Sequence, residues 1–406
     1  NITAGTLRLT GGSAISNTSE TVNVSAGATL NVAASEKING FDGAGTASIN
    51  AGQTLTLGSN NAGGIFSGDI TGAGNLYSYA NRTLSGNNDY TGTTTVNNGT
   101  MTVSATGDIN ESSAISILGK GTLNIDGGGN AALGDGVAVS NAGNFILTGS
   151  DETIGSINGA GNINLHGQTL TTGGDGTSTT LSGVISGSGG GLTKQGAGTF
   201  TLSGANTYTG ATTISAGTLQ VSNTNALGSN STVTVDGGSL DLTTDLSIGS
   251  LAGAGNVTLN TNTLTTGGNN TSTNYSGVLS GTGGLTKQGT GTLTLTGTNT
   301  YSGSTTINDG TISISSNSNL GNSNGNLVFN GGTLQATSNL TLSNGRDITI
   351  NSGGATFDTG ANNVTYNGRF ELANGGLTKK GSGTLKHTEF ANYKGNTVIE
   401  EGILEI

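Results

Sequence analysis

The chain of 406 residues contains no cysteine and no proline, and only 9% of its residues are charged. Without cysteine it forms no disulfide, which suits a chain that crosses membranes unfolded. Proline would remove a hydrogen-bond donor from a central strand, so its absence is typical of a protein built from such strands. Hydrophobic residues are only 31% of the chain, which is too few for a large globular core.

Charge and hydropathy exclude several classes of protein. The net charge of −11 argues against binding to nucleic acid or to an anionic membrane surface, because both need a basic patch. No apolar run approaches the 18 residues that a transmembrane helix requires. The sequence starts at Asn1 without a signal peptide and ends within a repeat. We therefore expect an interior piece of a longer precursor.

One long sequence pattern is repeated. The pattern G-L-T-K-Q-G-x-G-T-x-T-L-x-G-x-N-T-Y-x-G-x-T-T-I-x-x-G-T runs over 191–218 and 284–311, and a drifted copy covers 376–403. A weaker first copy contains Tyr90 and Gly92. Repetition at a fixed period indicates a solenoid, in which each repeat packs on its neighbours.

The copies divide the chain into four units of about 93 residues. We expect one β-helical body over 1–406, and the predicted units are approximately 40–101, 154–221, 248–314 and 340–406, with 102–153 as a less regular insertion of turns and short strands.

A shorter period lies inside each unit. Leu293 and Leu295 alternate with Thr292 and Thr294, and such alternation indicates a strand with opposite faces. Glycine, asparagine and serine interrupt each run, and the 76 glycines recur at fixed turn positions. The pattern predicts an all-β parallel β-helix of roughly twenty coils whose thin core is a stack of aliphatic side chains.

Certain residues recur at each copy of the pattern and are predicted to be structural. They are Gly191, Leu192, Leu202, Tyr208, Gly210, Ile214, Gly217, Gly284, Leu285, Leu295, Tyr301, Gly303, Ile307, Gly310, Leu377, Tyr393, Gly395, Ile399 and Gly402.

The repeated pattern resembles the passenger-associated transport repeat of Gram-negative autotransporters. The copy at 284–312 is nearly ideal, whereas the copy at 376–404 departs from it with His387, Glu389 and Lys394. The resemblance implies a right-handed β-helical passenger whose partner is a C-terminal outer-membrane β-barrel of the same precursor. It also implies a location at the cell surface or outside the cell, anchored to or released from the outer membrane. Repeats of this family support folding and export, while the activities of its members differ widely.

Two sets of repeated polar residues allow two interpretations. Lys194, Lys287 and the pair Lys379–Lys380 could bind an acidic ligand, but we expect them to lie in solvated turns that protect strand edges. The tyrosines that recur at 90, 208, 301 and 393 could form a carbohydrate-binding stripe, but we expect them to pack against the next coil. Asn206 and Asn299 are expected to hold turns through bonds to the backbone.

No catalytic, cofactor or metal site is predicted. The carboxylate pairs that a glycan-cleaving β-helix would use are Asp151–Glu152, Asp241–Asp245 and Glu400–Glu401, and none is accompanied by a basic cluster. His166 and His387 lack metal-ligand spacing.

The sequence favours a non-enzymatic stalk or adhesin exposed at the cell surface, with ligands on host or neighbouring cells. A self-associating fibre protein and, less favoured, a glycan-degrading enzyme are the alternatives. Residues 371–406 hold nine of the 35 charged residues. This segment is either a polar end coil that shields the last strand edge or the product of repeat drift.

Overall fold

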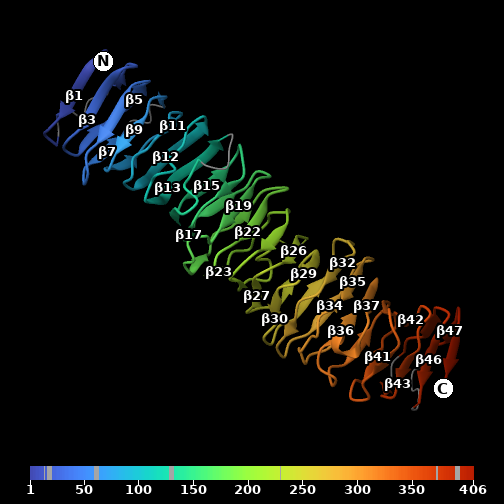
Figure 1. The fold of residues 1–406 in the computed structure, drawn as a ribbon. Coiled ribbons are helices and arrows are strands. Elements are labelled where there is room, and N and C mark those ends of the chain that lie inside the picture. Colours follow the sequence, from blue (N-terminus) through green and yellow to red (C-terminus); the bar gives the residue numbers. More distant parts are fainter. Residues whose placement is uncertain are drawn as a thin grey trace. The chain divides into compact units, whose positions relative to one another are not determined.

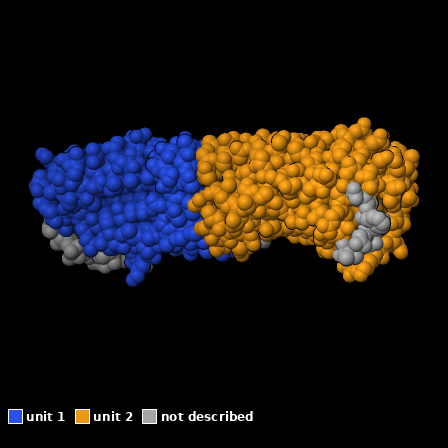
Figure 2. Space-filling model, turned by 90° about the horizontal axis from the view of Figure 1, so that it is seen from below, with its two compact units in different colours: residues 1–210 blue, residues 211–406 orange. Residues whose placement is uncertain are grey.

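The computed structural model describes residues 1–12, 14–15, 21–58, 64–127, 132–228, 230–371, 374–388 and 394–406. These residues form strands and turns, and the only helix among them is the short 3₁₀ helix η1 (Asn317–Leu320). The chain divides into two compact units, residues 1–210 and 211–406, which Figure 2 colours blue and orange. The prediction of a single body over 1–406 and of its four repeat units stays a prediction.

The described residues of the first unit form 23 strands, and Figure 1 labels many of them. In chain order they are β1 (Gly5–Leu9), β2 (Thr21–Val24), β3 (Ala28–Val32), β4 (Glu36–Ile38), β5 (Gly40–Gly43), β6 (Thr46–Ile49), β7 (Thr54–Leu57), β8 (Gly64–Phe66), β9 (Ile70–Gly72), β10 (Asn75–Ser78), β11 (Arg82–Leu84), β12 (Thr94–Ala105), β13 (Ala114–Gly127), β14 (Ala138–Asn141), β15 (Asn144–Leu147), β16 (Glu152–Thr153), β17 (Ser156–Asn158), β18 (Asn162–Asn164), β19 (Thr169–Thr172), β20 (Thr179–Leu181), β21 (Ile185–Ser186), β22 (Gly191–Lys194) and β23 (Thr199–Leu202).

In the second unit, 25 strands and η1 are formed by the residues that the structure describes. The strands are β24 (Thr212–Ile214), β25 (Thr218–Val221), β26 (Thr232–Val235), β27 (Ser239–Leu242), β28 (Leu246–Ser247), β29 (Ser250–Gly253), β30 (Asn256–Thr258), β31 (Leu264–Thr266), β32 (Thr273–Tyr275), β33 (Leu279–Ser280), β34 (Leu285–Lys287), β35 (Thr292–Leu295), β36 (Thr305–Ile307), β37 (Thr311–Ile314), β38 (Leu327–Phe329), β39 (Thr333–Ala336), β40 (Leu340–Leu342), β41 (Ile348–Ile350), β42 (Ala355–Asp358), β43 (Val364–Tyr366), β44 (Phe370–Glu371), β45 (Leu377–Lys380), β46 (Thr384–His387), β47 (Thr397–Ile399) and β48 (Ile403–Glu405).

Each strand pairs in parallel with a strand of the next coil, and the described residues form a β-solenoid of about 18 coils. In the second unit β35, β37, β39, β42 and β45 follow one another across one sheet. Thr292 pairs with Thr311 and Thr311 with Thr333, so like residues lie above one another. The parallel stacking is visible within each unit in Figure 1. The predicted all-β parallel solenoid is confirmed.

The core is a file of aliphatic side chains inside the coils. In β35 the two leucines are buried and the two threonines are half-exposed, as the alternation predicts. The core positions that the alternation indicates at 202, 214, 219, 293, 295, 307, 312 and 314 are all buried. A buried leucine or isoleucine contributes about 1.5–3 kcal/mol, so the stack replaces a globular core.

The segment 102–153 contains one strand, β13, that is longer than the sequence indicates, and the end of another long strand, β12. β12 spans 12 residues and β13 spans 14, and the two pair over almost their whole length. A bulge between Val96 and Asn98 lets β12 turn a corner without losing the ladder. The expectation of short strands in this segment is therefore wrong for β13, whereas β14 and β15 have four residues each.

A column of glycines marks one corner of the first unit. Gly143, Gly161, Gly183 and Gly204 lie on successive coils, and a Cβ at any of them would overlap the carbonyl oxygen of the glycine one coil earlier. Only glycine permits this close approach of two backbones.

Candidate functional site: the repeat signature and its buried cations

Each full copy of the signature buries a lysine. Lys194, Lys287 and Lys379 end or nearly end their strands, and no more than 1% of each is exposed. Lys287 Nζ donates to the carbonyl oxygens of Gln288 and Gly289, both at 2.7 Å, and lies 3.5 Å from that of Asp309 one coil later. Buried ammonium groups need such acceptors, because an unpaired buried charge is costly.

The other two lysines repeat this geometry. Lys194 Nζ donates to the carbonyl oxygens of Gln195 at 2.7 Å and Gly196 at 2.8 Å. Lys379 Nζ donates to those of Lys380 at 2.8 Å and Gly381 at 2.7 Å, and to Glu401 at 3.2 Å. The ammonium group therefore holds the turn that follows its strand and, in the later copies, ties it to the next coil.

The expectation that these lysines lie in solvated turns is wrong for all three. In the order Leu-Thr-Lys, the lysine is two residues from an inward leucine and therefore points inward as well. Burial lowers the pKa of Lys287, and the carboxylate of Asp309 opposes this shift. Lys380, the next residue in the last copy, is exposed and lies 3.4 Å from the carboxylate of Glu400.

The recurring tyrosines pack inside the coils. Tyr90, Tyr208 and Tyr301 are buried, which confirms packing rather than a carbohydrate-binding stripe, while Tyr393 lies outside the described residues. The hydroxyl of Tyr301 lies 2.5 Å from Oγ1 of Thr305, four residues later on the next strand. Burial raises the pKa of Tyr301 to about 12, so the hydroxyl stays neutral and can donate.

The asparagine two residues before each tyrosine connects neighbouring coils. Asn299 Oδ1 accepts from the N–H of Leu279 at 2.7 Å, and its Nδ2 donates to the carbonyl of Asn319 at 2.6 Å. Asn206 accepts from the N–H of Ile185 at 2.7 Å in the same manner. The predicted backbone role of these asparagines is confirmed, and the bonds extend to the coils on both sides.

The other signature positions are aliphatic side chains and glycines. The aliphatic residues at 192, 202, 214, 285, 295, 307 and 377 are all buried, whereas Ile399 is 52% exposed. Gly217, Gly310 and Gly402 have φ of 63°, 61° and 74° and begin the turn before the next strand. At positions 210, 303 and 395 a side chain would overlap the backbone of the preceding coil. Gly191 and Gly284 directly precede the inward leucines 192 and 285.

The last coil differs from the others. Val398, Ile399, Ile403 and Ile406 are between 47% and 76% exposed, and every residue of β47 is exposed. Apolar positions that are buried in the equivalent coil, such as Ile307, are therefore accessible to solvent in this one. The expectation of a polar end coil stays a prediction.

The carboxylates of the first two candidate pairs bond to the backbone and to amide side chains. Asp151 lies at the surface and accepts from the N–H of Thr169 at 2.7 Å, whereas Glu152 points inward and accepts from Leu133 at 3.1 Å. Asp241 faces outward and accepts from Gln220 and Asn260, both at 2.8 Å. The described residues contain no group of three ligating side chains that could hold a metal ion.

Glu152 is buried, which its sequence context as half of a carboxylate pair did not indicate. Its Oε2 has no hydrogen-bond partner among the described residues, and burial raises its pKa to about 8. Leu246 occupies the corresponding position of the next unit and is also buried. A glutamate at an inward position of the alternation is the signal that could have identified it.

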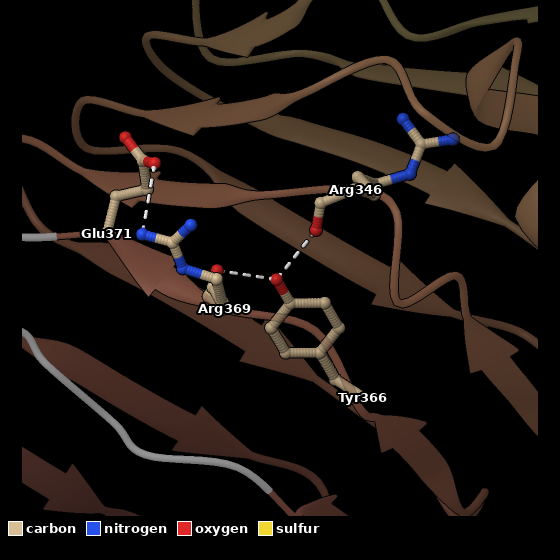
Figure 3. A network of polar contacts seen from close by, with 4 residues as sticks. All are labelled: Arg346, Tyr366, Arg369 and Glu371. Carbon is tan, nitrogen blue, oxygen red and sulfur yellow. Dashed lines mark hydrogen bonds and ion pairs between the residues drawn. The ribbon is translucent and has the colours of Figure 1, made fainter.

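A second kind of buried cation occurs between the signature copies. Arg346 is fully buried, and its guanidinium donates to the carbonyl oxygens of Asn322, at 2.9 Å, and Gly325. Figure 3 shows its backbone carbonyl joined to the hydroxyl of Tyr366, which lies 2.6 Å from this oxygen and from that of Arg369. Arg369 itself is exposed and forms a loose ion pair with Glu371.

Comparison with known families identifies the repeats. The model of the Passenger-associated-transport-repeat matches residues 83–103, 192–221, 285–314 and 377–406. The "Adhesin BmaC autotransporter" of Brucella suis biovar 1 (strain 1330) is 35% identical over 335 residues, which are 79% of this chain. The chain belongs to the autotransporter passengers.

Three of the four matched segments begin at the inward leucines 192, 285 and 377, so these three coincide with the buried-lysine coils. The chain spans only 9% of the Brucella autotransporter that it resembles. No solved structure matches this passenger. In the part of the passenger that the structure describes, no helix has the length and apolarity to cross a membrane.

Proposed function

We propose that this passenger is a non-enzymatic β-helical stalk and adhesin whose repeats support its folding and its export across the outer membrane. The C-terminal β-barrel of the same precursor is its export partner, and ligands on host surfaces or neighbouring cells are its targets. It acts at the cell surface of a Gram-negative bacterium, either anchored to the outer membrane or released from it.

The observation that carries this proposal is the use of the signature's polar groups. The lysine, asparagine and tyrosine of the copy at 285–314 are all buried, and the first two bond to the backbone of their own and adjacent coils. A side chain used in this way stabilises stacking and is not accessible to a ligand. The repeats therefore support a scaffold, and ligand binding belongs to the outward faces.

Export of the full-length precursor in a Gram-negative host tests the folding role. Gly303→Ala places a Cβ against the carbonyl of Gly283, so the coil cannot close. We expect less passenger to become accessible to external protease, with Lys380→Gln as the exposed control. Equal surface exposure of Gly303→Ala and the unmodified passenger would contradict the role in export. Fractionation of cells and medium then distinguishes anchored from released passenger.

Self-association is a second candidate function, which the outward residues favour. Thr292, Thr311, Thr333 and Thr356 form one straight file of hydroxyl groups on adjacent strands. Two copies could pair such files through many weak hydrogen bonds. Sedimentation velocity of the purified passenger tests this alternative, because only a self-associating chain sediments faster as its concentration rises.

A glycan-degrading activity is the least supported alternative. The carboxylates of Asp151 and Glu152 point to opposite faces, so this pair cannot flank one glycosidic bond. A screen for hydrolysis of soluble glycans would detect such an activity.

A further inference from the structure

Two aromatic side chains lie on the outside of the first unit. Tyr77 belongs to β10 and Tyr79 follows it, and the spacing of two residues places both on the outward face. Tyr79 is 38% exposed, whereas every other described tyrosine and phenylalanine except half-exposed Tyr77 is buried. A pair of accessible aromatic rings on a fold that otherwise buries them indicates a contact surface.

The two rings form a platform with polar groups at its edge. Their centroids are 4.8 Å apart and the ring planes are inclined by 36°. Asn97 Nδ2 donates to the Tyr77 hydroxyl at 2.6 Å, and Lys37 Nζ lies 5.8 Å from the centre of the Tyr79 ring. Apolar faces bordered by amide, hydroxyl and ammonium groups match a sugar ring, which has C–H faces and polar edges.

The positions of the accessible lysines and arginines also indicate a contact surface at this platform. Of the 12 lysines and arginines, five are buried, namely Arg82, Lys194, Lys287, Arg346 and Lys379. Between Arg8 and Arg369, this leaves only Lys37 and Lys120 accessible. Lys120 pairs in register with Asn98, the neighbour of Asn97. A chain of net charge −11 thus presents Lys37 beside its accessible aromatic pair and Lys120 on the strand that pairs with Asn98.

Hydrogen-bonding side chains continue from the platform along the solenoid. The outward residues in register with Tyr77 on successive strands are Lys37, Thr56, Thr95, Ser116, Ser140 and Asn158. This file contains no carboxylate, and its members are spaced by about 4.8 Å, the distance between strands. The spacing is close to the length of one sugar ring, so an extended chain of sugars could contact successive coils.

We propose that Tyr77, Tyr79, Asn97 and Lys37 form a binding site for an acidic glycan, which stacks on the two tyrosines and pairs its anionic group with Lys37 or Lys120. The proposal deepens the adhesin function proposed above and rests on it. Burial and the hydrogen bond with Tyr79 raise the pKa of Tyr77, so its hydroxyl remains protonated at neutral pH.

Hyaluronan oligosaccharides and their methyl esters are suitable probes, because the ester removes the charge and keeps the sugar. We expect the purified chain to bind the acid form in calorimetry and the ester at least about tenfold more weakly. Tyr79→Ala and Lys37→Gln should each weaken binding by about tenfold or more, because ring and charge are central to the contact. Tyr77→Phe should have a smaller effect, since it removes only the hydroxyl.

Lys380→Gln is the control, because it removes an exposed lysine that belongs to the second unit. It should leave binding unchanged, and circular dichroism should show that all variants remain folded. If hyaluronan, polygalacturonate and sialyllactose all fail to bind, or if Tyr79→Ala binds as tightly as the unmodified chain, the site is not a receptor for acidic glycans.

Cell-adhesion assays distinguish a failure of the glycan site from a failure of the proposed adhesin function. Bacteria that display the precursor with Tyr79→Ala should lose adhesion to surfaces coated with hyaluronan while keeping normal surface exposure. If adhesion to cells persists both with Tyr79→Ala and after glycosidase treatment of those cells, the proposed glycan site is wrong. The adhesin function itself is then retained. Absence of adhesion by the displayed, unmodified passenger would overturn the adhesin function itself.

Discussion

The copies of the signature at 285–314 and 377–406 have the same pattern but differ in burial. Ile307 is fully buried, and its equivalent Ile399 is 52% exposed. Thr305 is likewise buried, whereas Thr397 is exposed. The buried lysines, by contrast, have the same turn carbonyls as partners in both copies. The turn is therefore a property of the repeat itself, whereas core burial depends on a neighbouring coil.

A charge placed at equivalent core positions gives the largest expected difference. Ile307→Asp buries an unpaired carboxylate and should destabilise its unit by more than the 2–5 kcal/mol that is roughly typical of a truncation to alanine. Ile399→Asp should cost less than about 1 kcal/mol, because the side chain is already half in water. Hydrogen exchange in the neighbouring strands measures both. Equal effects of the two substitutions would show that the last coil is covered in solution.

A similar difference between equivalent positions involves the first unit. Glu152 lies there at the position that Leu246 occupies in the second unit. Burial, with a smaller contribution from Asp135, raises the pKa of Glu152 to about 8 from its ordinary value of 4.5. The pKa of Glu152 is higher in the folded state than in the unfolded state, so protonated Glu152 favours folding. This contribution to the free energy of unfolding is fully present below about pH 4.5 and is lost as pH rises through 8.

Replacing Glu152 with leucine should remove this pH dependence. The change of this pKa from 4.5 to about 8 corresponds to about 5 kcal/mol between the protonated and the ionised acid. At pH 9, β16 and β19 should therefore be more strongly protected in Glu152→Leu than in the unmodified chain. Hydrogen exchange at pH 5 and 9 measures the effect. Asp151→Asn, at the exposed neighbour, is the control and should retain the original pH profile.

The loss of stability on replacing a buried lysine should depend on the coils to which its ammonium group bonds. Lys287→Met leaves backbone carbonyls without their donor and should cost about 2–3 kcal/mol. Lys379→Met should cost less, because its third acceptor, the carbonyl of Glu401, belongs to the exposed last coil. Lys380→Met should have almost no effect. Urea unfolding followed by protease resistance gives the ranking, and an inert Lys287→Met would mean that the ammonium does not hold its turn.

The smallest effect is expected at the surface of the last copy. Lys386 and Glu405 form an exposed ion pair between β46 and β48. Lys386→Gln should change stability by no more than about 0.5 kcal/mol, and the change should vanish at 1 M salt. A larger loss that persists in salt would show that charge organises this coil after all.

The alternation of side chains was sufficient to predict the fold and most of the core. Leu293 and Leu295 are buried because period two and parallel stacking leave them no other face. The same rule places Lys287 inside, but the ordinary preference of lysine for water favours the opposite prediction. Its burial depends on three carbonyl oxygens whose convergence is a three-dimensional property of the turn.

The outward surface was less predictable than the core. Tyr90 and Tyr77 are both tyrosines in strands or turns of the first unit, yet one is inside and the other outside. The recurring position of Tyr90 in the repeat indicates a structural role, whereas Tyr77 has no recurring counterpart. The proximity of Tyr79 to Lys37 and Asn97 depends on the register of separate coils, which the sequence does not specify.

The glycine column has a consequence for how such a chain changes over evolutionary time. At Gly161, Gly183 and Gly204 a single substitution collides with the coil before it. Duplication of a whole coil creates no collision, because the new glycine meets a glycine. Recombination between similar coils is therefore tolerated at positions where a point mutation is not. A passenger of this kind can gain whole coils more readily than it can accept substitutions in its glycine column.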